Sequence, residues 1–178
     1  MASLHQLALP PVINGMRNTI AFLTKAQTHI QTTGIDPSTL TTASLHPTMR
    51  EFTAQIHWLI DAAKAMPSRI NPSLPPFSLP DVETDIPSLI AKLEKTIAYL
   101  EGIKPEDLNG RENDEVLFVI RPPGREEIRL RWDTAVVYVQ QFAHANFWFH
   151  VTTAYDILRH KGVELGKADF LQSARFLQ

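Results

Sequence analysis

The chain has 178 residues, with 17 Lys and Arg against 19 Asp and Glu, seven His and no Cys. At this length a single domain, residues 1–178, buries roughly 70% of the surface of its extended chain, so folding requires no disulfide or metal. The absence of cysteine excludes disulfides, thiolate zinc sites, iron–sulfur clusters and Cys nucleophiles. The formal net charge of -2 gives no basic field for a phosphate backbone, so we expect no nucleic acid partner.

The N-terminal residues do not have the pattern of a signal peptide. They lack a basic region and a small-residue cleavage site, and the pair Pro10-Pro11 interrupts their apolar residues. The most apolar stretch, residues 135–158, carries polar side chains such as Gln140, His144 and Asp156, which favours a buried helix over a membrane span. We therefore expect a cytoplasmic protein with no membrane partner.

Apolar residues at spacings of three and four predict two helices in the first half of the chain. The first helix follows the pair Pro10-Pro11, which suits a first helical turn, and ends before Gly34. After a Thr- and Ser-rich loop, the second helix begins at Thr48 and Glu51, which have the spacing of a capping box. Pro67 is expected to end this helix.

Residues 67–87 contain six prolines, which are too many for regular structure. Leu74, Phe77 and Leu79 give this crossover apolar side chains to bury, so we expect an ordered strap instead of a flexible linker. The third helix is predicted to start near Pro87 and to stop near Gly102.

The only strand signal lies between the third and fourth helices. Residues 116–120 favour β structure, Pro122-Pro123-Gly124 is a turn, and residues 128–132 alternate apolar with Arg side chains, which predicts a hairpin. Asp133 is expected to cap the fourth helix, which runs to Lys161 before Gly162. The expected fold is an all-α four-helix bundle with a small β-hairpin inserted between the third and fourth helices.

The fourth helix places a polar triplet, Asn146, His150 and Thr153, inside an apolar stripe. A buried polar group without a partner costs roughly 1–3 kcal/mol, so the triplet indicates a satisfied network or a ligand pocket. One interpretation is a core histidine bonded to another helix. In the other, His150 is a general acid or base, Asn146 orients a substrate, and Tyr155 or Gln55 assists.

The opposite face of the same helix is also apolar and includes His144, Trp148, Val151, Tyr155 and Leu158. A helix that is apolar all round must be covered all round. Two alternatives could bury this second face: a second copy of the chain in a homodimer, or the hairpin and the strap of the same subunit.

Seven histidines invite a metal hypothesis, but no two of them are three or four residues apart, as ligands on one helix must be. His144 and His150, for example, lie about 120° apart around the helix. An alternative site combines His57 or His46 with His150 and Asp61. His57 and Asp61 are four residues apart, a spacing at which the carboxylate can hold the imidazole, but a surface ion pair is the commoner outcome and is what we expect. Because the histidine spacing disfavours a shared ion, we predict no metal ligand and no cofactor.

These patterns define a predicted small-molecule site between the second and fourth helices. The catalytic candidates are His150, Asn146 and Tyr155, and the substrate-binding candidates are Gln55, His57, Phe149 and Thr153.

The C-terminal third contains the run FWFHVTTAYDILRH at residues 147–160, followed by GVELGK at 162–167 and DFL at 169–171. This run resembles a family of bacterial and fungal proteins described as a domain of unknown function and grouped with the DinB/YfiT-like helical bundles. The resemblance extends from Leu4 to Leu171, with residues 35–37 and 95–101 as further landmarks.

The resemblance implies an up-down-down-up-like four-helix bundle that is often dimeric. Better-known relatives are described as metalloenzymes or thiol transferases that use three histidines, one near the second helix and two on the last. Here only His150 has a counterpart, and Asn146 stands one turn before it. Three functions follow as hypotheses: a metal-independent small-molecule binder or enzyme, a divalent-metal-dependent hydrolase or transferase, and a non-enzymatic dimeric scaffold.

Overall fold

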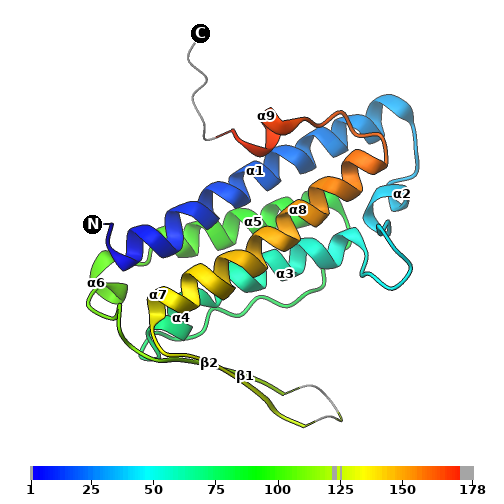
Figure 1. The fold of residues 1–178 in the computed structure, drawn as a ribbon. Coiled ribbons are helices and arrows are strands. Elements are labelled where there is room, and N and C mark those ends of the chain that lie inside the picture. Colours follow the sequence, from blue (N-terminus) through cyan, green and yellow to red (C-terminus); the bar gives the residue numbers. More distant parts are fainter. Residues whose placement is uncertain (1, 122–123, 125, 173–178) are drawn as a thin grey trace.

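The computed structural model describes residues 2–121, 124 and 126–172 (Figure 1). The described chain is mostly helical, with one two-stranded antiparallel sheet, as the sequence predicts. In chain order the elements are α1 (Leu4–Thr33), α2 (Ser38–Thr41), α3 (Phe52–Lys64), α4 (Met66–Ile70), α5 (Ile86–Glu101), α6 (Pro105–Leu108), β1 (Val116–Ile120), β2 (Ile128–Trp132), α7 (Ala135–Tyr138), the π-helical turn η1 (Val139–Ala143), α8 (His144–His160) and α9 (Lys167–Phe170).

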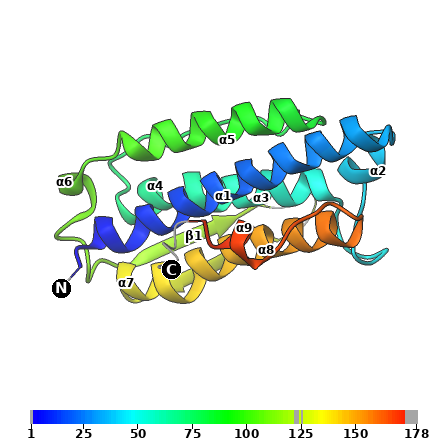
Figure 2. The same cartoon turned by 90° about the horizontal axis from the view of Figure 1, so that it is seen from above.

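The long helices α1, α3, α5 and α8 run side by side, and the hairpin of β1 and β2 projects away from them (Figures 1 and 2). The most extensive helix pairing is between α3 and α8, while α1 contacts both α5 and α8. The core between the helices includes fully buried aromatic side chains such as Phe22, Phe52 and Phe147. Within the described residues, no helix is long and apolar enough to cross a membrane.

Helix α1 starts at Leu4, earlier than the prolines suggest. Ser3 and Gln6 form a reciprocal capping box that satisfies the first amides, so the helix begins before Pro10 and Pro11 and contains both. The prediction that these prolines form the first turn was therefore wrong. The predicted end is confirmed, because Gly34 adopts a left-handed conformation with φ of 69°.

Helix α3 begins at Phe52 without the predicted capping box. Glu51 is the N-cap and its side chain accepts no capping bond, while the hydroxyl of Thr48 pairs with Nδ1 of His46 at 2.9 Å. The amide of Phe52 instead donates to the carbonyl of Ala43 at 2.8 Å, so the preceding loop satisfies the helix terminus.

The end of α3 also differs from the prediction. The helix ends at Lys64, and Pro67 lies in the first turn of the following helix α4, where its missing N–H requires no partner. The third predicted helix agrees better: Asp85 caps α5 by accepting from the amide of Ser88 at 2.9 Å.

The strap was predicted over residues 67–87, but it is limited to residues 71–85, because residues 67–70 belong to α4 and residues 86 and 87 begin α5. Its first residue is held by the bond from Asn71 to the carbonyl of Asp107, and its middle by the bond from Lys64 to the carbonyl of Leu79. Phe77 stacks on Tyr99 of α5, with ring centroids 4.2 Å apart.

The hairpin pairs Val116 with Trp132 and Ile120 with Ile128, which confirms both predicted strands. Pro122 and Pro123 of the predicted turn lie outside the described residues. Thr134, one residue later than expected, caps the last long helix, because its hydroxyl accepts from the amide of Val137 at 3.1 Å. The predicted cap at Asp133 was therefore wrong.

The second apolar face of α8 is covered within the described chain by α1 and α9. Trp148 and Tyr155 of α8 contact Phe170 of α9, with ring centroids 5.9 and 5.7 Å apart, and Tyr155 also contacts Phe22 of α1. The bond from Asn18 to the carbonyl of Phe170 and the ion pair of Lys25 with Asp169 hold α9 in place. This cover is neither the hairpin nor the strap.

Candidate functional site

His150 of α8 is joined to α3 by a chain of two hydrogen bonds. Its Nδ1 lies 2.8 Å from Oε1 of Gln55, and Nε2 of Gln55 donates to the carbonyl of Arg50 at 3.0 Å. The backbone carbonyl of Arg50 can only accept a hydrogen bond, so the Gln55 atom that faces it must be the amide nitrogen Nε2. This bond therefore sets the orientation of the Gln55 side chain. The Oε1 atom then requires a donor, which makes Nδ1 of His150 the protonated nitrogen.

The other ring nitrogen of His150 is left with a lone pair. Within the part of the chain that the structure describes, Nε2 has no hydrogen-bond partner. Among the described residues, the side-chain atom that is both fully buried and without a partner is Oη of Tyr99, not Nε2 of His150. The Nε2 atom therefore reaches solvent, although the whole residue is only 8% exposed. Burial lowers the pKa of His150, because desolvation disfavours the charged imidazolium. The ring is thus neutral at neutral pH.

Two aromatic side chains flank the His150 ring. Trp58 of α3 lies 5.3 Å from it and Phe149 of α8 lies 5.2 Å from it, measured between ring centroids. Both are large apolar side chains at the surface, 38% and 57% exposed respectively. The imidazole ring is therefore flanked by two exposed aromatic side chains.

The remaining polar residues of the predicted triplet do not join this pair. The hydroxyl of Thr153 donates to the carbonyl of Phe149 in its own helix at 2.8 Å, so its hydrogen bond is formed within α8 and not with His150. Asn146 is half-buried, and its side chain makes no hydrogen bond to any described residue.

Tyr155, the third catalytic candidate, lies on the other side of α8. Its ring packs against Phe22 of α1 and Phe170 of α9, whereas His150 faces Gln55 of α3. The structure therefore brings His150, Gln55 and Phe149 together but does not bring Tyr155 to them.

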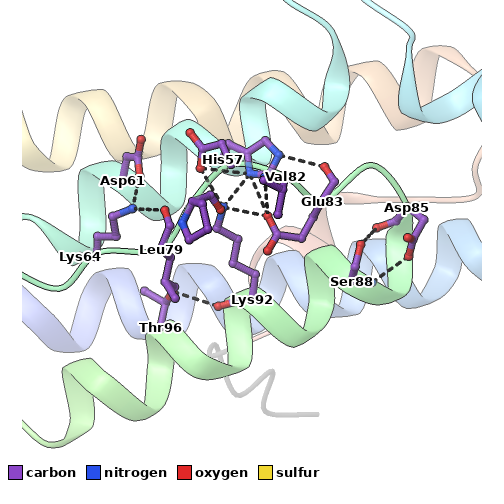
Figure 3. A network of polar contacts seen from close by, with 12 residues as sticks. His57, Asp61, Lys64, Leu79, Val82, Glu83, Asp85, Ser88, Lys92 and Thr96 are labelled. Atoms are coloured by element: carbon purple, nitrogen blue, oxygen red, sulfur yellow. Dashed lines mark hydrogen bonds and ion pairs between the residues drawn. The ribbon is translucent and has the colours of Figure 1, made fainter.

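His57 belongs to a different cluster, between α3, the strap and α5 (Figure 3). Its Nε2 lies 3.0 Å from the carbonyl of Glu83, and its Nδ1 lies 3.0 Å from Nζ of Lys92. The same ammonium donates to the carbonyl of Pro80 at 2.6 Å, to Oδ1 of Asp81 at 2.7 Å and to Oε2 of Glu83 at 2.9 Å. Lys92 is only 2% exposed.

The cluster also affects the charge of the strap. Burial alone raises the pKa of Glu83, but the hydrogen bond from Lys92 and backbone hydrogen bonds outweigh it, and the net pKa is lowered. Glu83 is therefore a carboxylate at neutral pH.

Sequence reasoning missed Lys92. The available signal was its position, because Lys92 falls on the same side of α5 as the buried residues Leu89 and Thr96, at spacings of three and four. A lysine on the apolar face of a helix is almost never fully buried unless it is paired, so its place predicts an anionic partner.

The cluster lines one hollow in the surface, with a volume of about 230 Å³. Its lining consists of Arg50, Glu51, Thr53, Ala54, His57, Trp58, Asp81, Glu83 and Thr84. A neighbouring hollow of about 330 Å³ shares Glu51, Thr53 and Thr84 with it. His150 lines neither hollow, but Trp58 both lines the first one and contacts His150.

The residues of the alternative metal site are engaged elsewhere. His46 pairs with Thr48, Asp61 pairs with Lys64 at 2.5 Å, and His57 belongs to the cluster just described. The expected surface ion pair of His57 with Asp61 was therefore wrong. Over residues 2–121, 124 and 126–172, no three His, Cys, Asp or Glu side chains are arranged to hold a metal ion.

The structure is similar to that of a DinB family member protein from Shewanella denitrificans, with a TM-score of 0.80 and 26% sequence identity. The match covers 98% of this chain and 95% of that chain. The protein is thus a helical protein of the DinB-like class.

The family itself follows from the sequence match. The family described as Domain of unknown function (DUF1993) matches residues 4–171, so the chain belongs to this family. The predicted resemblance is confirmed, with the same bounds. No curated protein matches the chain.

Proposed function

We propose that this protein is a DinB-type four-helix bundle that binds or transforms a small molecule at His150 without a metal. The observation that carries this proposal is the pairing of Nδ1 with Gln55, which leaves the Nε2 lone pair of a nearly buried imidazole open to solvent. A group with this arrangement acts as a hydrogen-bond acceptor or a general base.

The protonation state supports the same role. A general base is effective when its lone pair is available at the working pH, and burial lowers the pKa of His150. The side-chain amide of Gln55 also holds the His150 ring in one orientation. In enzymes with a nucleophile and a general base, a third group orients the base in the same way.

The surroundings indicate what the ligand must offer. Nε2 requires a ligand N–H, O–H or S–H group, and the exposed rings of Trp58 and Phe149 favour an apolar or aromatic portion beside it. Trp58 also lines the 230 Å³ hollow, whose charged residues suit a polar end of the same ligand.

A thermal-shift screen tests this proposal. The wild-type chain, His150→Ala and the control His160→Ala are heated with a panel of metabolites and divalent metals; His160 is exposed at the far end of the same helix. A ligand at 100 times its Kd stabilises the folded state by about 2.7 kcal/mol, which is readily detected.

We expect a metabolite that stabilises the wild-type chain and His160→Ala but not His150→Ala. Metabolite shifts that His150→Ala retains contradict a site at His150. A metal shift that is lost in His150→Ala supports the metal-dependent alternative instead.

A second candidate function, a dimeric scaffold, is favoured by the exposure of Trp58 and Phe149. Exposed aromatic pairs are typical of protein contacts as well as of ligand sites. If this is their use, the double variant Trp58→Ser/Phe149→Ser becomes monomeric in sedimentation, and the wild-type chain is a dimer. A wild-type chain that sediments as a monomer rejects the scaffold.

A further inference from the structure

A further hollow, of about 370 Å³, lies between α8 and α9, on the side of α8 that is turned away from His150 (Figure 2). We call it the α8–α9 hollow. Two groups of side chains line it: Thr152, Tyr155 and Asp156 of α8, and Lys167, Phe170 and Leu171 at α9. Within each group the residues are three and four positions apart, so one stripe of α8 faces one stripe of α9 across the hollow.

Much of the lining of the α8–α9 hollow is apolar. The rings of Tyr155 and Phe170 pack edge to face with their centroids 5.7 Å apart, and Phe170 also stacks on the buried Phe22 of α1 at 6.0 Å. Tyr155, Phe170 and Leu171 are only partly buried, so they retain apolar surface that a ligand can cover. Such a surface favours a ligand with an aliphatic or aromatic group.

Two opposite charges line the same hollow without pairing. Asp156 lies on the α8 wall and Lys167 lies on the α9 wall, and both residues are exposed. The ion pair that holds α9 is formed by Lys25 and Asp169 and involves neither of them. Among the described residues, Asp156 and Lys167 form no ion pair with each other or with a third residue. The hollow therefore offers one anion and one cation on its two walls, together with apolar surface.

We propose that the α8–α9 hollow binds a free amino acid with an apolar side chain. The ammonium of the ligand pairs with Asp156, its carboxylate pairs with Lys167, and its side chain covers Tyr155 and Phe170. A ligand with one charge of each sign satisfies both walls at once, whereas a simple amine or a simple carboxylic acid leaves one wall unpaired. This site is separate from His150 and does not depend on the function proposed there.

Titration of the ¹⁵N-labelled chain, followed by ¹H–¹⁵N spectra, tests the proposal because it reports both affinity and location. The probes are L-phenylalanine and L-leucine. Three further compounds each lack one feature: 3-phenylpropionate lacks the ammonium, 2-phenylethylamine lacks the carboxylate, and glycine lacks the side chain. We expect the two probes to produce saturable shifts of the amide signals of Asp156, Lys167 and Leu171. The three partial ligands should bind about fivefold more weakly or not at all.

Two variants assign the charged groups of the ligand to the two walls. Asp156→Asn should lose the preference for L-phenylalanine over 3-phenylpropionate but keep the preference over 2-phenylethylamine. Lys167→Gln should show the reverse pattern, because it lacks the partner of the carboxylate. Lys161→Gln is the matched control, since it removes another exposed lysine at the end of α8, and it should bind as the wild-type chain does.

The result that overturns the proposal is equally specific. It is the absence of saturable shifts around the α8–α9 hollow, or binding of 3-phenylpropionate and 2-phenylethylamine by the wild-type chain as tightly as L-phenylalanine. Circular dichroism verifies that each variant is folded. His150→Ala should bind both amino acids normally, so a failure at this hollow is distinguishable from a failure of the proposed function at His150.

Discussion

At the residue scale, two groups set the orientation and the tautomer of His150: the side chain of Gln55 on α3, and the carbonyl of Arg50 in the loop before that helix. The carbonyl of Arg50 orients Gln55, and Gln55 in turn accepts from Nδ1 of His150. The sequence placed His150 and Gln55 among the candidates because both lie on apolar helix faces, and the structure joins them. The helical repeat places Tyr155 on the opposite face, about 140° around the helix from His150, and the structure agrees, because its ring packs against Phe22 and Phe170.

The lowered pKa of His150 predicts how stability changes with pH. Because the unfolded chain protonates this residue near its ordinary pKa of about 6.5 and the folded chain protonates it only at lower pH, the unfolded state binds more protons in between. The free energy of unfolding should therefore fall as the pH drops below about 6.5.

Urea denaturation of the wild-type chain and of His150→Gln between pH 7.5 and pH 5.5 measures this effect. The wild-type chain should lose more stability than His150→Gln over this range, because the variant lacks the titrating group. Equal losses in the two proteins would show that His150 does not have a lowered pKa.

At the element scale, the packing of α1 against α8 depends on Gly15. A Cβ atom at this position would lie 2.5 Å from Cε1 of Phe147 and 2.9 Å from Cη2 of Trp148, so the two helices approach too closely for any side chain. Helix periodicity predicted both helices but not this contact, since a glycine within a helix gives no sign of which aromatic ring will lie above it.

The variant Gly15→Ala tests the contact. Alanine gains about 1 kcal/mol over glycine from helix propensity, but overpacking against rigid rings costs about 1–3 kcal/mol, so we expect net destabilisation. Gly166→Ala is the control, because its Cβ would meet nothing within 4 Å. A Gly15→Ala chain that is more stable than wild type in urea would contradict the close approach of α1 and α8.

At the scale of the whole molecule, periodicity and turn residues were sufficient for the mostly helical class, both strands and the strap. Three features depend on long-range contacts and were missed. The buried Lys92 draws its partners from the strap, α9 closes over Trp148, and the loop carbonyl of Ala43 replaces the expected cap of α3. A local pattern cannot indicate which distant group will satisfy a helix terminus or a buried charge.

The central claim is that the whole folded chain holds His150 neutral, protonated on Nδ1, with its Nε2 lone pair open. The most direct measurement is a ¹⁵N spectrum of the histidine-labelled protein over a pH titration, with His150→Gln to assign the signals. We predict the Nδ1–H tautomer for His150 and a midpoint below about 6.5. An Nε2–H tautomer, or protonation at higher pH, would contradict the proposed function.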